Sequence, residues 1–180
     1  MQHEAIPQTG VRFTQAHRAH LDEILALEQA AYPLPWSRQN FISILDDSSG
    51  RYTVQLLRLR AERDREVLAG YFVALLGVEE AHLLNVAVHP RLQGQGWGQL
   101  LLRQLQTWAV LHGARQIWLE VRDSNPRARQ VYERWGDGAA QGLLPGTRRR
   151  PRGCDRDVPA AAGLKHPGIA PSPGGDSLRQ

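Results

Sequence analysis

The chain has 180 residues, of which 42% are hydrophobic, a size that fits one domain with a core and is too small for two ordinary domains. Its single cysteine, Cys154, excludes an internal disulfide and a metal cage built from thiolates. No apolar run approaches the ~20 residues of a membrane span, and the N-terminus lacks the pattern of a signal peptide. We therefore expect a soluble, cytoplasmic protein with no membrane partner.

The net charge of +4 makes nucleic acid a candidate partner, so the position of the charge matters. Residues 1–135 carry 15 basic and 14 acidic side chains, whereas residues 136–180 carry 7 and 4. The second segment also holds 15 of the 28 glycines and prolines and none of the 12 aromatic residues. These shifts divide the chain into an extension over residues 1–10, a domain over residues 11–136 and a Gly/Pro/Arg-rich tail over residues 137–180, which we expect to be disordered.

Hydrophobic periodicity predicts the elements of the domain. Strands are expected over residues 11–16, 51–59, 67–77, 81–89 and 115–121, with the charged residues 60–66 as a hairpin connection. Helices are expected over residues 20–32 and 35–45, from the glycine loop to Gly113, and over residues 124–136. Ser37 is placed to cap the second helix, and Ser124 or Asn125 the last. The order predicts an α+β domain whose mainly antiparallel sheet becomes parallel across the third helix, with a ligand at that crossover.

The loop before the third helix, "LQGQGWG" over residues 92–98, has glycines at alternate positions. Gly94, Gly96 and Gly98 let the backbone approach a ligand, and the first N–H groups of the helix supply partial positive charge for an anion. A flexible turn before a helix is the competing interpretation. The spacing differs from the dinucleotide-binding G-x-G-x-x-G, and the Gly-Lys-Ser/Thr of a Walker-type loop is absent. The pattern predicts a phosphate-binding loop of neither nucleotide type.

Two separated motifs carry a resemblance to a known family. Gln93, Gly96 and Gly98 form Q-x-x-G-x-G after the strand "NVAV", and "LEVRDSNPRARQVYERWG" follows one strand later, over residues 119–136. In this order they resemble the GNAT superfamily of acetyl-CoA-dependent N-acetyltransferases. With "PWS" at residues 35–37, they are similar in particular to the RimI-type ribosomal-protein alanine N-acetyltransferases. The resemblance spans about residues 11–136 and implies the GNAT (acyl-CoA N-acyltransferase) fold.

The resemblance also implies acetyl-CoA as co-substrate and the N-terminal segment of a ribosomal protein as partner. The seven histidines show no paired metal spacing, so we expect no metal. It assigns cofactor contacts to the strand residues Val86, Ala87 and Val88, whose side chains alone indicate only buried sheet. Asn125 either binds the cofactor, caps its helix, or does both. The implied loop contacts are Gly94, Gln95, Gly96, Trp97, Gly98 and Gln99, of which Trp97 departs from the smaller aliphatic residue often found there.

Attack of an amine on a thioester needs a base, a polarised carbonyl and a proton for the departing thiolate. Glu120 is the predicted base: by strand alternation it shares a face with Trp118, and a nearby apolar wall can raise the pKa of a carboxyl group toward the working pH. Tyr132 is the predicted acid, about two helical turns after Asn125 and matching the family's tyrosine. A solvent-facing carboxylate and a core tyrosine are the competing interpretations of these two residues.

Two other functions stay open from the sequence. The enzyme could act on another amine, such as a polyamine, an antibiotic or a protein lysine, or the chain could be an inactive ribosome- or RNA-associated module. The arginine-rich "GTRRRPRG" over residues 146–153 lacks interleaved aromatic residues, so we expect no direct binding of nucleic acid. Turnover of the thioester separates an enzyme from a binding module.

The family's C-terminal part is missing from this sequence. After "YERWG" the family should continue with Phe, two more strands, a Tyr-Tyr pair and an Arg-Glu-Asp-Ala segment. Residues 137–163 show none of these and no strand period, so we expect the final strands to be lost. Codons read one base later from Asp137 onward permit tyrosine at both Leu143 and Leu144, and Arg-Glu-Asp-Ala within residues 151–159. We therefore hypothesise a single-base frame change near Gly136, with a genuine divergent tail as the alternative.

Overall fold

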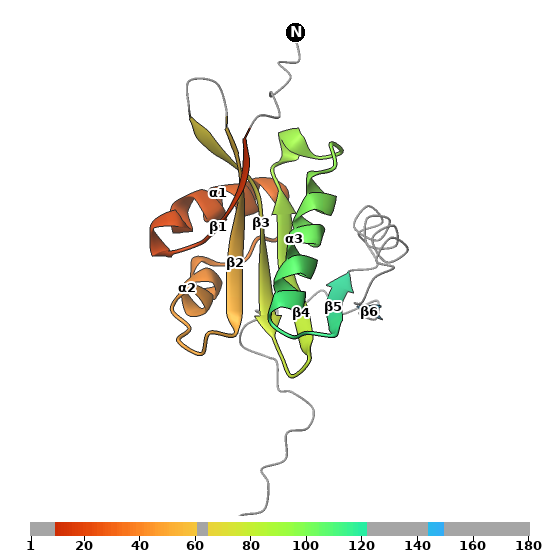
Figure 1. Cartoon of the computed structure of the whole chain (residues 1–180). Coiled ribbons are helices and arrows are strands. Elements are labelled where there is room, and N and C mark those ends of the chain that lie inside the picture. The colour runs from red at the N-terminus through yellow and green to blue at the C-terminus, as the bar shows by residue number, and fades with distance from the viewer. Residues whose placement is uncertain (1–9, 61–64, 122–143, 150–180) are drawn as a thin grey trace, which may run out of the picture.

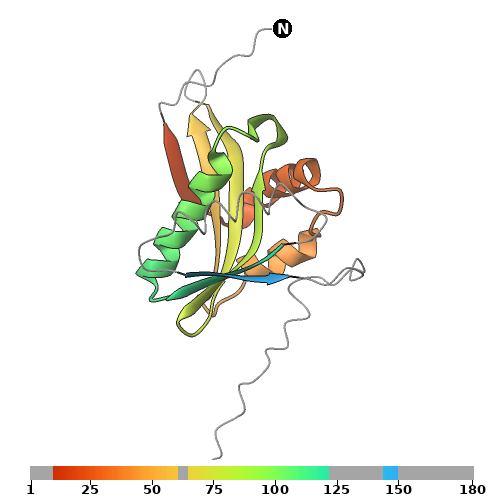
Figure 2. The same cartoon turned by 90° about the vertical axis from the view of Figure 1, so that its right-hand side faces the viewer.

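The computed structural model describes residues 10–60, 65–121 and 144–149. A six-stranded sheet with the order β1-β2-β3-β4-β5-β6 forms the centre of the domain. Figure 2 views this sheet between two layers of helix, with α3 on one face and α1 and α2 on the other. Each face covers its own buried hydrophobic cluster, so the domain has the predicted α+β layers.

The first four strands form an antiparallel meander (Figure 1). They are β1 (Val11–Gln15), β2 (Tyr52–Arg60), β3 (Glu66–Leu76) and β4 (Glu80–Val88). Seven consecutive residues of β3, from Ala69 to Leu75, are buried, as expected for a central strand covered on both faces. The predicted antiparallel pairing and the hairpin between β2 and β3 are confirmed.

Two helices connect β1 to β2 and cover one face of the sheet. A short 3-10 turn, η1 (Arg18–His20), leads into α1 (Leu21–Ala31), and α2 (Arg38–Leu45) follows. The predicted cap of α2 is confirmed, because the Ser37 side chain accepts a hydrogen bond of 3.2 Å from the Asn40 backbone N–H. The same N–H also donates to the Ser37 backbone carbonyl at 3.1 Å, so the N-cap residue supplies both acceptors for this group of the first turn.

The third helix makes the crossover that turns the sheet parallel. After the 3-10 turn η3 (Pro90–Leu92), α3 (Trp97–Leu111) packs its apolar side on the sheet, and β5 (Gln116–Val121) then runs parallel to β4. Gly70 of β3 permits close packing here, because an added Cβ would lie 2.6 Å from the Ala87 carbonyl oxygen and 3.0 Å from Leu101 Cδ1. Gly113, at φ 79°, ends the helix region as predicted.

A sixth strand corrects the expectation that no strand follows Gly136. β6 (Leu144–Arg149) pairs in parallel with β5, from Gln116 opposite Leu144 to Val121 opposite Arg149. Main-chain hydrogen bonding explains the error: an exposed strand edge pairs with any extended segment and needs no side-chain period. Pro145 and Gly146 weaken the strand signal in the sequence, and proline is tolerated at the sheet edge where β6 lies. The expected helix over residues 124–136 and the rest of the tail fall outside the described residues.

Candidate active site

The strands β4 and β5 pair over only half of β4. The pairs run from Glu80 and Gln116 to Leu83 and Leu119, and then stop. At the same level β4 has a β-bulge: Leu83 lies opposite Ala74 and Asn85 opposite Val73, so Leu84 is an extra residue. A bulge bends its strand and raises the local twist. The bulge thus coincides with the place where β4 leaves β5, and residues 85–88 keep a backbone edge that β5 does not pair, here called the free edge of β4.

The hydrogen-bond register shows which backbone groups point to the free edge. The His89 N–H donates to the Ala69 carbonyl at 2.8 Å, and antiparallel pairing alternates, so the backbone of Ala87 opposite Tyr71 points toward β3. Val86 and Val88 therefore point the other way. Among the residues assigned to the cofactor, Val86 and Val88 present their N–H groups at the free edge, whereas Ala87 does not.

Both carbonyls at the free edge already accept hydrogen bonds from within the protein. The Tyr32 hydroxyl donates to the Val86 carbonyl. The side-chain amide of Gln93 donates to the Val88 carbonyl at 3.1 Å. The N–H groups of Val86 and Val88 remain directed to the side on which β5 has departed, where they can polarise a carbonyl oxygen.

The glycine loop follows β4 directly and has the backbone geometry that glycine permits. Gly94 and Gly96 have φ values of 83° and 89°, in the left-handed region that β-carbons disfavour. Gly96 is the N-cap of α3, and the first bond of the helix runs from the Leu100 N–H to the Gly96 carbonyl at 3.1 Å. The N–H groups of residues 97–99 precede that bond, so the helix itself does not satisfy them.

Side chains hold the loop without using those N–H groups. The Gln95 side-chain amide donates to the Arg91 carbonyl at 3.2 Å, and the Trp97 indole N–H donates to the Gln95 side-chain oxygen at 3.4 Å. A Cβ added at Gly96 would meet nothing within 4 Å, and at Gly98 only Val88 Cγ2 at 4.0 Å. Open space therefore lies beside a row of N–H groups at the positive end of a helix, the arrangement that binds phosphate groups.

The structure describes the position of Glu120 but not that of Tyr132. Glu120 lies in β5, one residue beyond the last pair with β4, and opposite Arg148 of β6. The backbone thus puts it at the level where the two strands part. Tyr132 and Asn125 lie outside the described residues, and their roles remain predictions.

A buried polar cluster behind the free edge was missed from the sequence. Glu28 of α1 is 1% exposed, and its carboxylate accepts from the Trp36 N–H at 2.8 Å, from the Asn85 side-chain amide at 3.2 Å and from the Tyr71 hydroxyl. Burial raises the pKa of the Tyr71 phenol far above its usual range, and the nearby Glu28 carboxylate raises it further. The sequence held one signal: Glu28 follows Leu21, Ile24 and Leu25 on the apolar stripe of α1.

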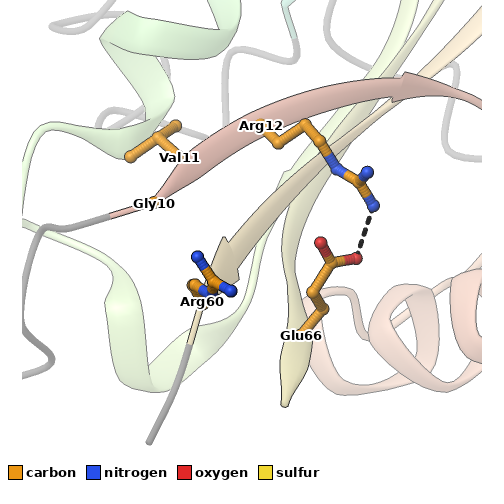
Figure 3. Close-up of a pocket in the computed structure, with 5 residues that line it drawn as sticks. All are labelled: Gly10, Val11, Arg12, Arg60 and Glu66. Atoms are coloured by element: carbon orange, nitrogen blue, oxygen red, sulfur yellow. Dashed lines mark hydrogen bonds and ion pairs between the residues drawn. The ribbon is translucent and has the colours of Figure 1, made fainter. Parts of the chain in front are cut away.

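A surface pocket lies elsewhere, at the edge formed by β1 and the β2–β3 hairpin (Figure 3). It has a volume of about 470 Å³ and contains an ion pair of 2.6 Å between Arg12 and Glu66. None of the predicted site residues lines it; the lining residues are Gly10, Val11, Arg12, Arg60 and Glu66. This pocket is thus separate from the glycine loop and the free edge of β4.

Within residues 10–60, 65–121 and 144–149, no three His, Cys, Asp or Glu side chains gather as a metal would require. In the same part of the chain, no helix has the length and apolar character needed to cross a membrane.

A sequence match to a known protein family covers the glycine loop and the strands β4 and β5. Residues 21–137 match the acetyltransferase (GNAT) family, and the chain belongs to this family. Its fold is accordingly the GNAT fold. Family members use acetyl-CoA.

Similarity to individual proteins is more specific. The chain is 32% identical over 123 residues to the [ribosomal protein bS18]-alanine N-acetyltransferase of Haemophilus influenzae, covering 68% of this chain and 78% of the relative. The crystal structure of the ribosomal-protein-S18-alanine N-acetyltransferase from Escherichia coli aligns with a TM-score of 0.61 and 31% identity, over 71% of this chain and 77% of that one. PaiA N-acetyltransferase from Thermoplasma acidophilum, solved with coenzyme A, shares the fold at 12% identity, with a TM-score of 0.62 over 71% and 89% of the chains.

Proposed function

We propose that this protein transfers the acetyl group of acetyl-CoA to the N-terminal alanine amine of a small-subunit ribosomal protein in the cytoplasm. The observation that carries the proposal is the similarity, at 31 to 32% identity over about two thirds of the chain, to two enzymes named for this reaction. The matched region includes the glycine loop, β4 and β5. These are the elements that a thioester-dependent transfer requires.

Acetyl-CoA binding is assigned to two neighbouring parts of the backbone. The N–H groups of the loop from Gly94 to Gln99 would hold the pyrophosphate, because they combine close approach with the positive end of α3. The N–H groups of Val86 and Val88 would hold the pantetheine and polarise the thioester carbonyl. Asn125 would add a side-chain contact to the cofactor.

The chemical step is a direct transfer between the two bound substrates. The amine nitrogen attacks the thioester carbon, an N–C bond forms and the C–S bond breaks. An α-amino group has a pKa of ~7.7 to 8.0 and is largely protonated at neutral pH, so Glu120 removes a proton from the amine, directly or through water. Tyr132 supplies the proton that the leaving thiolate takes up. No acetylated enzyme forms.

A peptide assay tests the proposal. The full chain is incubated with acetyl-CoA and a peptide that begins with alanine and also contains an internal lysine, and the products are mapped by tandem mass spectrometry. Acetylation at the α-amine is expected. A peptide that begins with proline, a secondary amine, is the matched control. Acetylation at lysine alone would assign the enzyme to another amine, and no thioester turnover with either peptide would reject the enzymatic function.

A further inference from the structure

The helix α1 approaches the free edge of β4 through two polar side chains one turn apart. Glu28 lies in the last turn of α1, and Tyr32 is the C-cap residue that follows the helix, with its backbone N–H bonded to the Glu28 carbonyl at 3.0 Å. Glu28 contacts Asn85, the residue that follows the bulge. Tyr32 contacts the carbonyl of Val86, the next residue. Two consecutive residues of β4 are therefore bonded to the last turn of α1 and to its C-cap residue.

The Glu28 carboxylate joins three segments that are distant in sequence. Its donors come from the connection between α1 and α2 at Trp36, from β3 at Tyr71 and from β4 at Asn85. Asn85 also donates to the Tyr71 hydroxyl at 3.1 Å, so the three side chains form a closed set of bonds. Burial and the Glu28 carboxylate raise the pKa of Tyr71, which favours the protonated hydroxyl that donates to Glu28.

We propose that Glu28 and Tyr32 are positioning residues of the acetyl transfer: they hold the Asn85–Val86 segment so that the Val86 N–H meets the thioester carbonyl. This inference rests on the proposed function. Neither residue touches the reacting atoms, and each acts through the β4 backbone. A bulge is otherwise an irregular part of a ladder, so a segment directly after it needs support from outside the sheet.

Loss of the Glu28 or Tyr32 contact would displace the Val86 N–H group but would not prevent the cofactor from binding. A shift of about 1 Å in a group that stabilises the transition state can lower the rate by about a hundredfold. The glycine loop keeps its own hydrogen bonds, from Gln93 to Val88 and from Gln95 to Arg91. Binding of the cofactor's phosphates therefore stays, while the chemical step slows.

The test compares Glu28→Gln with the control Ile24→Val. Ile24 lies one turn earlier on α1, is fully buried in the hydrophobic cluster on that face of the sheet and has no part in the polar bonds. The glutamine keeps the shape of glutamate but replaces one acceptor oxygen by an N–H donor, which cannot accept from Tyr71 or from Trp36 and Asn85. We expect kcat for peptide acetylation to fall by about 10-fold to 100-fold. The affinity for coenzyme A should stay within about threefold of the wild-type value. Ile24→Val should leave both constants close to wild type.

Amide hydrogen exchange gives a readout that does not depend on activity. The segment over residues 84–88 should exchange faster in Glu28→Gln than in Ile24→Val at equal thermal midpoint. If Glu28→Gln does not fold, Tyr32→Phe removes the bond to the Val86 carbonyl and should lower kcat with unchanged coenzyme A affinity. Equal exchange of residues 84–88 in variant and control, or an activity loss that matches the loss of folded protein, would overturn the inference. A wild-type protein without acetyl transfer would reject the proposed function, and the exchange data would still decide whether α1 holds the β4 segment.

Discussion

Gly96 offers the sharpest test of the loop, through the substitution Gly96→Val. Two separate effects are expected. The first is backbone strain, because Gly96 has φ 89°, and a left-handed conformation costs an ordinary residue about 1–2 kcal/mol. The second is obstruction, because the added side chain enters the open space beside the loop N–H groups. If it displaces two charge-assisted hydrogen bonds of about 1.5–3 kcal/mol each, coenzyme A affinity falls by about 10² to 10⁴.

The matched control is Gly113→Val at the opposite end of α3. Gly113 has φ 79° and, like Gly96, no atom within 4 Å of an added Cβ. Both variants should lose similar folding stability, measured by thermal unfolding. Only Gly96→Val should lose coenzyme A binding, measured by isothermal titration calorimetry. Equal coenzyme A affinities in the two folded variants would refute the assignment of the loop to the pyrophosphate.

Three further predictions address catalysis, folding and the origin of the tail. Glu120→Gln should lower turnover by about 10² to 10⁴ with coenzyme A binding unchanged, and a stopped-time acetylation assay with a smaller loss would remove Glu120 as the base. Ser37→Ala should cost about 1 kcal/mol of folding free energy and lower the melting temperature by about 2–4 °C. The control Ser43→Ala should change little, because the Ser43 hydroxyl donates only to the Gln39 carbonyl within the same helix. Equal shifts in melting temperature would argue against the cap. Resequencing of the gene should reveal a one-base difference near the codon of Gly136, and an unambiguous in-frame reading with a protease-resistant tail would contradict the frame change.

Much of the fold could be predicted because its signals are local. The strand residues of β2 and β3 are rich in branched and aromatic side chains, and Ser37 precedes an apolar helical pattern, so the sequence identifies these elements without knowledge of their neighbours. The glycine loop is equally local, since Gly94 and Gly96 have the left-handed φ values for which glycine is suited.

The missed features depend on contacts between distant segments. The pairing of β6 with β5 uses main-chain groups, so Pro145 and Gly146 give no sign of it. The bulge at Leu84 is a property of the register with β3 and leaves no mark in β4 alone. Glu28 interrupts an apolar stripe, but its partners Tyr71 and Asn85 lie 43 and 57 residues away. Glu120, Tyr132 and Asn125 were assigned with the help of family motifs, and the Glu120→Gln assay tests the first of them.

The extra residue Leu84 changes the hydrogen-bond ladder of β4 with β3 but leaves the other side chains of β4 on the same faces of the sheet. Leu84 and Asn85 both face α1 and α2, while Leu83 before them and Val86 after them face α3. A strand without Leu84 would keep every other side chain of β4 on its present face, and its ladder with β3 would become regular. What it would lose is the bend that lets β4 depart from β5. Leu84 therefore matters through its place in the register and not through a polar side chain, and a substitution that preserves its hydrophobicity would matter less than its deletion.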